Sequence, residues 1–263
     1  IKSDFKWVFS RCPCLRNPHL RLVNSGFSDF GTPKNPSFKI HSYKKITMKI
    51  VEKFISIDGE GPTAGGLSVF IRLAGCNLRC VWCDTCYAQD YNSHTEELSV
   101  EEIVDYVRST EIEHVTLTGG EPLIHTDVKN LLTELAKIVE VHVETNGSVD
   151  ISEYRVSEKV HFVVDYKLPE SGMENTMCLK NLANVTKNDA YKFVISSESD
   201  AYKALQIIKE NNLTNTTQVY LSCVFENFTP ENLVEIMKKE KLNGVILQLQ
   251  MHKFIWDKNK RGV

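Results

Sequence analysis

The chain has 263 residues and a mass of 30.0 kDa, and its 31 Lys and Arg against 34 Asp and Glu give a formal net charge of −3. With 42% hydrophobic and 25% charged residues, its composition is that of a globular protein, which excludes disordered, collagen-like and coiled-coil chains. No apolar run approaches the ~18 residues of a membrane span, and the mildly negative charge gives no support to a nucleic-acid-binding role.

The first 47 residues differ from the rest of the chain. They carry nine Lys and Arg against two Asp and Glu, and they hold four of the eight prolines without a clear apolar period. Met48 follows, and strand-like apolar residues begin directly after it. We therefore expect residues 1–47 to be a non-native or disordered leader and residues 48–263 to form the functional domain. A basic targeting presequence is the alternative interpretation of the leader.

Eight runs rich in Val, Ile and Phe predict β-strands from Met48 onward. Their bounds are 50–57, 67–74, 114–118, 141–145, 160–165, 190–195, 218–224 and 245–249.

Amphipathic helices are predicted between several of these strands. Ser99 and Glu102 have the spacing of a capping box. Apolar stripes at helical spacing begin at Val128 and Ala201, and Thr229 before a proline is typical of a helix start. Repeated strand–helix alternation predicts an α/β fold with a mainly parallel sheet. Because a complete eight-fold barrel typically takes ~250 residues, we expect a shortened, open (β/α) barrel, with a flat doubly wound sheet as the alternative.

Polar motifs follow four of the predicted strands. They are Gly75-Cys76, Gly119-Gly120-Glu121-Pro122, Thr145-Asn146-Gly147 and Tyr166-Lys167-Leu168-Pro169. The carboxyl ends of parallel strands form the active face of such folds, so this arrangement predicts an enzyme.

The cysteines predict a metal centre. Four of the eight lie at positions 76, 80, 83 and 86, whereas a secreted disulfide framework would be spread through a small fold. We therefore expect a metal-binding protein of the reducing cytoplasm. Cys76, Cys80 and Cys83 have C-x3-C-x2-C spacing, and three thiolates can hold a [4Fe-4S] cluster while leaving one iron open. The alternatives are a closed zinc or electron-transfer site completed by Cys86, and purely structural cysteines.

This cysteine motif, with Trp82 before its last cysteine, and the run Thr118-Gly119-Gly120-Glu121-Pro122 together resemble the radical S-adenosylmethionine (SAM) superfamily. The resemblance implies that SAM chelates the open iron, and that an electron from the cluster cleaves it to methionine and a 5′-deoxyadenosyl radical. It also implies a set of residues at the SAM site, for which we expect Trp82, Asp84, Gly120, Glu121, Asn146, Asp165 and Lys167.

Segments 56–62, 69–74, 83–85 and 252–256 are similar to those of the 7-carboxy-7-deazaguanine synthase family, and the likeness runs from about Met48 to the C-terminus. Members convert 6-carboxy-5,6,7,8-tetrahydropterin to 7-carboxy-7-deazaguanine with loss of ammonia, in queuosine and other deazapurine biosynthesis. The resemblance implies Mg²⁺ at Thr85 and a set of substrate contacts, namely Ile57, Asp58, Gly59, Glu60, Arg72 and Thr118.

The chemistry of these residue types agrees with those roles. The fork of a guanidinium at Arg72 suits a substrate carboxylate, and Glu60 can accept two hydrogen bonds from a guanidine-like ring edge. The hydroxyl of Thr85 is a hard oxygen donor of the kind that Mg²⁺ prefers. Many family members carry Gln where this chain has Asp58, so a carboxylate replaces an amide at that position.

The resemblance further implies a flavodoxin-type reductant and a homodimer, with a small-molecule pterin as the substrate and no nucleic-acid or membrane partner. A radical SAM activase of a glycyl-radical enzyme and a non-enzymatic iron–sulfur or zinc module are the alternative functions. We interpret His252 and Trp256 as packing residues, and Cys12, Cys14, Cys178 and Cys223 as structural or incidental.

Overall fold

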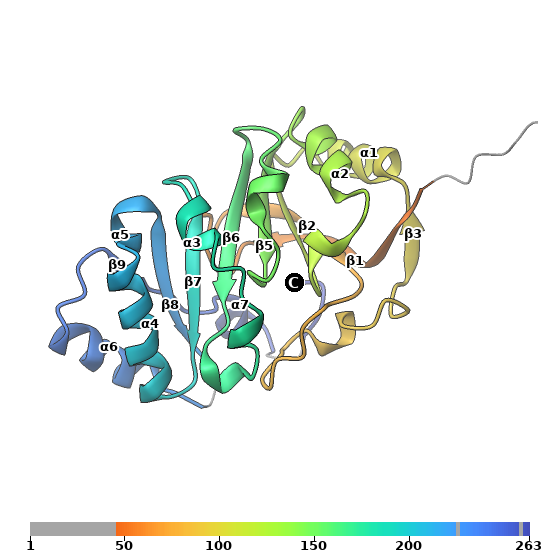
Figure 1. Cartoon of the computed structure of the whole chain (residues 1–263). Helices are drawn as coiled ribbons and strands as arrows, with labels where there is room; N and C mark the ends of the chain where they lie inside the picture. The colour runs from red at the N-terminus through yellow and green to blue at the C-terminus, as the bar shows by residue number, and fades with distance from the viewer. Residues whose placement is uncertain (1–45, 225–226, 258–259) are drawn as a thin grey trace, which may run out of the picture. The chain divides into compact units, whose positions relative to one another are not determined.

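The computed structural model describes residues 46–224, 227–257 and 260–263, so nearly all of the expected leader lies outside the described residues. The described domain is built on one nine-stranded sheet with the order β3-β1-β2-β4-β5-β6-β7-β8-β9 (Figure 1). Its strands are β1 (Met48–Ile57), β2 (Leu67–Leu73), β3 (Glu96–Leu98), β4 (His114–Gly119), β5 (Glu140–Thr145), β6 (Val160–Tyr166), β7 (Ala190–Ile195), β8 (Gln218–Cys223) and β9 (Val245–Leu247).

All strand pairs from β2 through β9 are parallel, whereas β1 runs antiparallel to both β2 and β3. The eight predicted strands are confirmed, each within two residues of its predicted ends. The short edge strand β3 was not predicted, because three residues with the sequence Glu-Glu-Leu carry no apolar alternation.

The described residues also form seven α-helices and five 3₁₀ turns. The helices are α1 (Val100–Thr110), α2 (Val128–Leu135), α3 (Asn181–Asn184), α4 (Glu198–Glu210), α5 (Leu213–Thr216), α6 (Pro230–Lys239) and α7 (His252–Ile255). The 3₁₀ turns are η1 (Cys86–Ala88), η2 (Pro122–Ile124), η3 (Ile151–Tyr154), η4 (Pro169–Ser171) and η5 (Glu174–Thr176). The capping box of Ser99 with Glu102 is confirmed at α1, and the Thr229 side chain caps α6 by accepting from the backbone N–H of Asn232.

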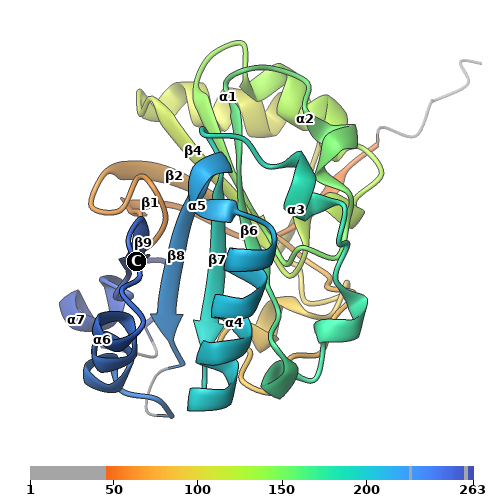
Figure 2. The same cartoon turned by 60° about the vertical axis from the view of Figure 1, so that its left-hand side comes forward.

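The sheet has one apolar face and one polar face. In-register partners on parallel strands share a face, and the partners Ile71 and Leu117 belong to the apolar one. The buried residues of α1, α2, α4 and α6 join this face in a single core, and Figure 2 shows α4 lying over β7. Each fully buried aliphatic or aromatic side chain of this core contributes about 1.5–3 kcal/mol.

Because the four longest helices pack on one face, the sheet is not the doubly wound kind, which has helices on both. In the described part of the chain β3 and β9 are the edge strands and do not pair with each other, so the sheet is open. The prediction of an open, mainly parallel α/β barrel is therefore confirmed. The opposite, polar side is called the inner face below.

In the described residues, no helix combines the length and the apolar character that crossing a membrane would require.

Candidate active site

The cysteine loop, residues 75–86, leaves the carboxyl end of β2. Gly75 has φ +100, and a Cβ there would lie 2.3 Å from the ring of Tyr91, so the chain needs glycine at this corner. The backbone N–H of Gly75 donates to the carbonyl of Ala88 at 2.7 Å, and that of Cys76 donates to Gln89 at 3.1 Å. These bonds close the base of the loop and hold its cysteines beside the inner face.

The three cysteines of the motif are free, partly buried thiols within electrostatic reach of one another. Burial is the main cause that raises the pKa of Cys76 and Cys80, so neither is built as a free thiolate nucleophile. Coordination to a metal deprotonates such a thiol outright. Cys86 begins η1 and is exposed. The three thiols therefore fit a cluster with one open iron.

A single metal ion would need ligands that converge on one point. In the described residues no three His, Cys, Asp or Glu side chains are grouped closely enough to hold one ion. A cubane cluster distributes its thiolates over separate irons, so its ligands need not converge in this way.

The glycine pair after β4 explains how the neighbouring motif reaches the cysteine loop. A Cβ on Gly119 would lie 2.5 Å from the carbonyl oxygen of Leu73, and one on Gly120 would lie 2.3 Å from that of Gly75 and 2.8 Å from Cβ of Cys76. All three distances are far below van der Waals contact. Glycine is needed because the ends of β2 and β4 touch through their backbones.

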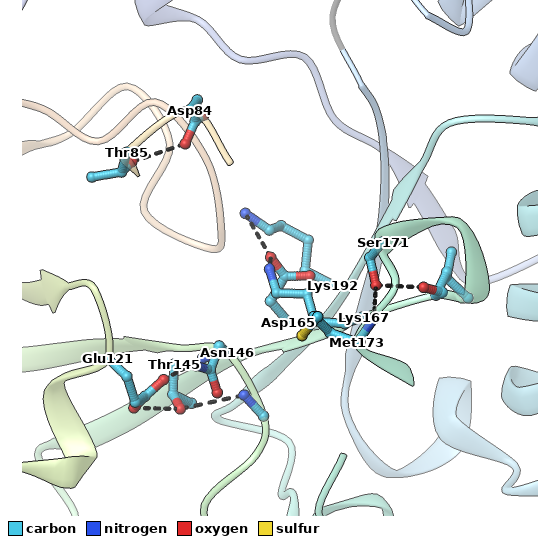
Figure 3. A network of polar contacts seen from close by, with 12 residues as sticks. Asp84, Thr85, Glu121, Thr145, Asn146, Asp165, Lys167, Ser171, Met173 and Lys192 are labelled. Atoms are coloured by element: carbon cyan, nitrogen blue, oxygen red, sulfur yellow. Dashed lines mark hydrogen bonds and ion pairs between the residues drawn. The ribbon is translucent and has the colours of Figure 1, made fainter. Parts of the chain in front are cut away.

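The carboxylate of Glu121 joins the end of β4 to the end of β5. It is fully buried and accepts from the backbone N–H of Leu123 at 2.9 Å. It also accepts from the hydroxyl of Thr145 at 2.9 Å and from the backbone N–H of Asn146 at 2.7 Å, two residues that lie beside it in Figure 3. Burial raises the pKa of Glu121 to about 7, although these hydrogen bonds oppose the shift. Asn146 in turn donates to Asn77 at 3.0 Å and reaches Sγ of Cys76 at 3.7 Å. Glu121 therefore positions the turn that touches the cysteine loop.

Segment 58–66, called the substrate loop below, enters the inner face from the other end of the sheet. Ile57, the last residue of β1, pairs with Leu67 at the start of β2, so this loop lies opposite the cysteine loop along β2. Asp58 is buried and accepts from the hydroxyls of Thr63 at 2.6 Å and Thr116 at 2.9 Å. The backbone N–H of Gly61 donates to Gln248 at 2.8 Å.

The arginine ahead of the cysteine loop is held by an acidic partner. Arg72 and Thr118 are in-register partners on the inner face, and Nε of Arg72 donates to Oε1 of Glu52 at 2.7 Å. The hydroxyl of Tyr87 donates to the same oxygen at 2.9 Å. Among the described residues none accepts from the terminal nitrogens of Arg72. They remain available to a ligand.

The end of the cysteine loop presents two oxygen donors. The hydroxyl of Thr85 donates to Oδ1 of Asp84 at 2.8 Å (Figure 3). Desolvation would raise the pKa of Asp84, but the Thr85 hydroxyl and the cations Lys253, Lys192 and Arg72 outweigh it, so the pKa is lowered. Asp84 therefore lies within electrostatic reach of these three cations, although its side chain is 57% exposed.

The sequence analysis interpreted His252 as a packing residue, but it did not indicate what this residue packs against. The backbone N–H of Met251 donates to the carbonyl of Gly59 at 3.2 Å, and a Cβ on Gly59 would lie 2.6 Å from Nδ1 of His252. Nζ of Lys253 lies 4.0 Å from Oδ2 of Asp84. His252 thus packs against the substrate loop, and this arrangement depends on a contact between distant segments that local spacing does not indicate.

The structure brings most of the expected site residues to the inner face and its cysteine-loop end. Figure 3 shows Asp84 and Thr85 on one side and Glu121 with Asn146 on another, while Asp165, Lys167 and Lys192 lie near the centre of the view. Ile57 is an exception, since it pairs with Leu67 in the β1–β2 ladder, on the opposite face of the sheet from Arg72. Glu52 and Lys192 were missed, although a lysine in the middle of an otherwise apolar strand is a usable signal.

Comparison with known proteins identifies the family to which the chain belongs. The family model of the Radical SAM superfamily matches residues 70–239. A 7-carboxy-7-deazaguanine synthase of Clostridium acetobutylicum is 47% identical over 221 residues, covering 83% of this chain and 100% of that protein. Synthases of the same name from Chlorobaculum tepidum and Leptospira interrogans are 34% and 36% identical, and the alignments cover 97% and 99% of those proteins.

Among solved structures, the crystal structure of QueE from Escherichia coli matches with a TM-score of 0.58. It is 21% identical in sequence, and the match covers 77% of this chain and 94% of that one. At this identity the likeness concerns the fold alone, and it agrees with the open, mainly parallel sheet.

Proposed function

Since the chain belongs to the radical SAM superfamily and, within it, to the 7-carboxy-7-deazaguanine synthase family, we infer that it is a radical SAM lyase. It converts 6-carboxy-5,6,7,8-tetrahydropterin to 7-carboxy-7-deazaguanine with loss of ammonia, a step of queuosine and deazapurine biosynthesis. The observation that carries this inference is the set of three free thiols at the carboxyl end of β2, beside a polar inner face.

Cys76, Cys80 and Cys83 would hold the [4Fe-4S] cluster, with SAM at its open iron. When bound, the cluster and SAM supply the one-electron chemistry that activates one C–H bond of the substrate. The residues proposed around SAM are Trp82, Asp84, Gly120, Glu121, Asn146, Asp165 and Lys167. Within this set Glu121 is proposed to position the turn at Asn146, because its carboxylate already accepts from the backbone N–H of Asn146 and from the hydroxyl of Thr145.

The pterin would lie on the inner face between the substrate loop and the cysteine loop. The terminal nitrogens of Arg72, which have no acceptor among the described residues, suit its carboxylate, while Nε stays fixed on Glu52. Glu60 and Thr118 are proposed to bind the ring edge, with Ile57, Asp58 and Gly59 completing the contact. Both oxygens of Asp58 already accept one hydroxyl each, so a pterin N–H would use a second lone pair.

A Mg²⁺ ion is proposed at Thr85, with Asp84 beside it as a second oxygen donor. The ion would hold the substrate carboxylate in place and stabilise negative charge there. The bond between Met251 and Gly59 closes one side of the inner face, which helps to exclude water from a reactive substrate.

Three further features are proposed from the family resemblance. They are a flavodoxin-type reductant, a homodimeric assembly and a location in the reducing cytoplasm. We also propose that residues 48–263 are the catalytic domain. In support, the Clostridium relative is covered over 100% of its length by 83% of this chain.

Product formation tests the proposed function. The anaerobically reconstituted protein is incubated with the tetrahydropterin, SAM, Mg²⁺ and a reductant, and the deazaguanine product is quantified. We expect product and one ammonia per turnover. An intact cluster that yields no product would contradict the assignment, whereas a glycyl radical formed on a protein partner would favour the activase.

The magnesium site has a separate prediction. Thr85→Ala removes one proposed oxygen ligand, so the Mg²⁺ concentration for half-maximal activity should rise by about tenfold while iron content stays constant. Thr133→Ala is the matched control, because that hydroxyl lies outside the core on α2 and donates to the carbonyl of Lys129 in its own helix. Equal Mg²⁺ dependence in both variants would contradict a role for Thr85.

A further inference from the structure

One buried lysine joins two parts of the site that come from different segments. Lys192 lies in the middle of β7, where its register partners Asp165 and Tyr220 place it on the inner face. Its side chain is 12% exposed, and Nζ lies 3.0 Å from Oε2 of Glu60 and 3.9 Å from Oδ2 of Asp165. Glu60 belongs to the substrate loop, whereas Asp165 lies within electrostatic reach of Cys80. A single ammonium group therefore contacts both the proposed pterin side and the proposed SAM side.

Glu60 and Asp165 each use one carboxylate oxygen to contact a lysine, and the other oxygen of each has no partner among the described residues. Oδ2 of Asp165 also accepts from Lys167 at 2.7 Å, as the central pair in Figure 3 shows. Oε1 of Glu60 and Oδ1 of Asp165 are buried, and within the described residues neither has a hydrogen-bond partner. A buried carboxylate oxygen without a donor is costly, so two such atoms beside one lysine indicate that a bound ligand supplies the donors.

The charge balance shows why the ammonium is needed. Without it, Glu60 would lie in a buried site beside the negative charge of Asp165, and removal of one partner from a buried ion pair leaves an uncompensated charge. Lys167 neutralises Asp165 but has no ion pair with Glu60. Among the described residues, Lys192 is the one cation that pairs with Glu60.

We propose that Lys192 is a positioning residue that orients Glu60 toward the N–H groups of the pterin ring edge and Asp165 toward a donor on SAM. This role deepens the synthase function and rests on the pterin site proposed above. It predicts that Lys192 affects binding through Glu60, and that it does not touch the reacting carbon.

The test measures binding apart from turnover. The probe is 6-carboxypterin, an aromatic analogue that keeps the ring edge and carboxylate, and its fluorescence reports its binding to the anaerobically reconstituted protein with SAM present. Lys192→Met should weaken this binding by roughly 100-fold, as expected when one partner of a buried charge pair is truncated. Lys192→Arg should recover most of the loss, because a cation returns to the same place. Lys209→Met is the control, since that lysine lies on the exposed side of α4.

A double-mutant cycle separates positioning from a general loss of stability. If Lys192 acts through Glu60, then Glu60→Gln with Lys192→Met should bind the probe about as weakly as Glu60→Gln alone. The iron content of all variants should equal that of the parent. Unchanged binding in Lys192→Met, additive losses in the cycle, or loss of the cluster in Lys192→Met and Lys192→Arg together would each overturn the proposal. Failure of the parent itself to bind 6-carboxypterin would instead contradict the pterin function, and the inference would fall with it.

Discussion

At the scale of single residues, the site is organised by side chains that hold other side chains. Arg72 is fixed through Nε by Glu52, and Tyr87 donates to the same carboxylate oxygen. Fixing a guanidinium in this way lowers the entropy lost when its other nitrogens bind a ligand. The sequence predicted the role of Arg72 from its family position. It could not predict Glu52, because that contact depends on the antiparallel register of β1 and β2.

The pKa of the Asp58 carboxyl group is shifted by its surroundings. Its side chain is buried, and burial raises its pKa to about 6, although hydrogen bonds from Thr63 and Thr116 oppose the shift. A raised pKa means that the folded state favours the neutral acid. That contribution to stability is fully present below pH 3.8, the ordinary value, and it is lost as the pH rises through about 6. A shift of about two pKa units corresponds to ~3 kcal/mol.

Asp58→Asn tests this sign. The amide cannot ionise, so the free energy of unfolding of the variant should exceed that of the parent by up to ~3 kcal/mol at pH 8. The difference should shrink as the pH falls to 5. Urea unfolding followed by tryptophan fluorescence, at several pH values, measures it. A difference that stays constant across this range would show that the carboxyl does not titrate there.

At the scale of elements, the approach of β4 to the cysteine loop is the most demanding feature. Gly120 leaves no space for a side chain, because a Cβ would lie 2.3 Å from the carbonyl oxygen of Gly75. The motif itself was visible in the sequence, and a role near the ligand was expected for it. The sequence did not show that Gly120 is needed because its backbone touches the end of β2. This became clear only from the pairing of β2 with β4.

Gly120→Ala should therefore displace the cysteine loop and reduce the iron bound per chain after reconstitution by about tenfold or more, since backbone atoms cannot move aside as a flexible side chain can. Gly66→Ala is the matched control: there the new Cβ would lie 3.1 Å from the carbonyl of Thr63, a contact that a small shift relieves. Iron and sulfide analysis of both proteins gives the measurement. Normal iron content in Gly120→Ala would contradict the packing argument.

The elements themselves were predictable where their pattern was long. Strands such as β7 and the caps of α1 and α6 follow from local residues, and they agree with the structure. The substrate loop was different. Its residues were identified, but its entry from the amino-terminal side of β2 was not, because β1 runs antiparallel to β2 and so reverses the chain direction before the parallel sheet begins.

At the scale of the whole molecule, strand–helix alternation sufficed to predict an open barrel-type sheet. The length of the chain after position 47 indicated a shortened barrel, and the single helix-covered face of the sheet excludes the doubly wound alternative. The catalytic domain is proposed to begin at Met48, which is the first residue of β1 and is buried in the core.

Truncation tests this boundary. A chain that begins at Met48 should keep the parent's cluster content and melt within a few degrees of it, because β1 and its core contacts stay complete. A chain that begins at Phe54 is the contrast, since it lacks Met48, Ile50 and Val51 and should fail to fold. Loss of folding in the Met48 chain would contradict the proposed boundary.

The central claim is that three thiolates of the cysteine loop leave one iron open to SAM, with Cys86 outside the ligand set. Electron paramagnetic resonance of the reduced, anaerobically reconstituted Cys86→Ser protein, with and without SAM, tests it most directly. We predict a [4Fe-4S] signal of the parent's intensity whose g values shift when SAM is added. Loss of the cluster in this variant, or a spectrum that SAM leaves unchanged, would contradict the account.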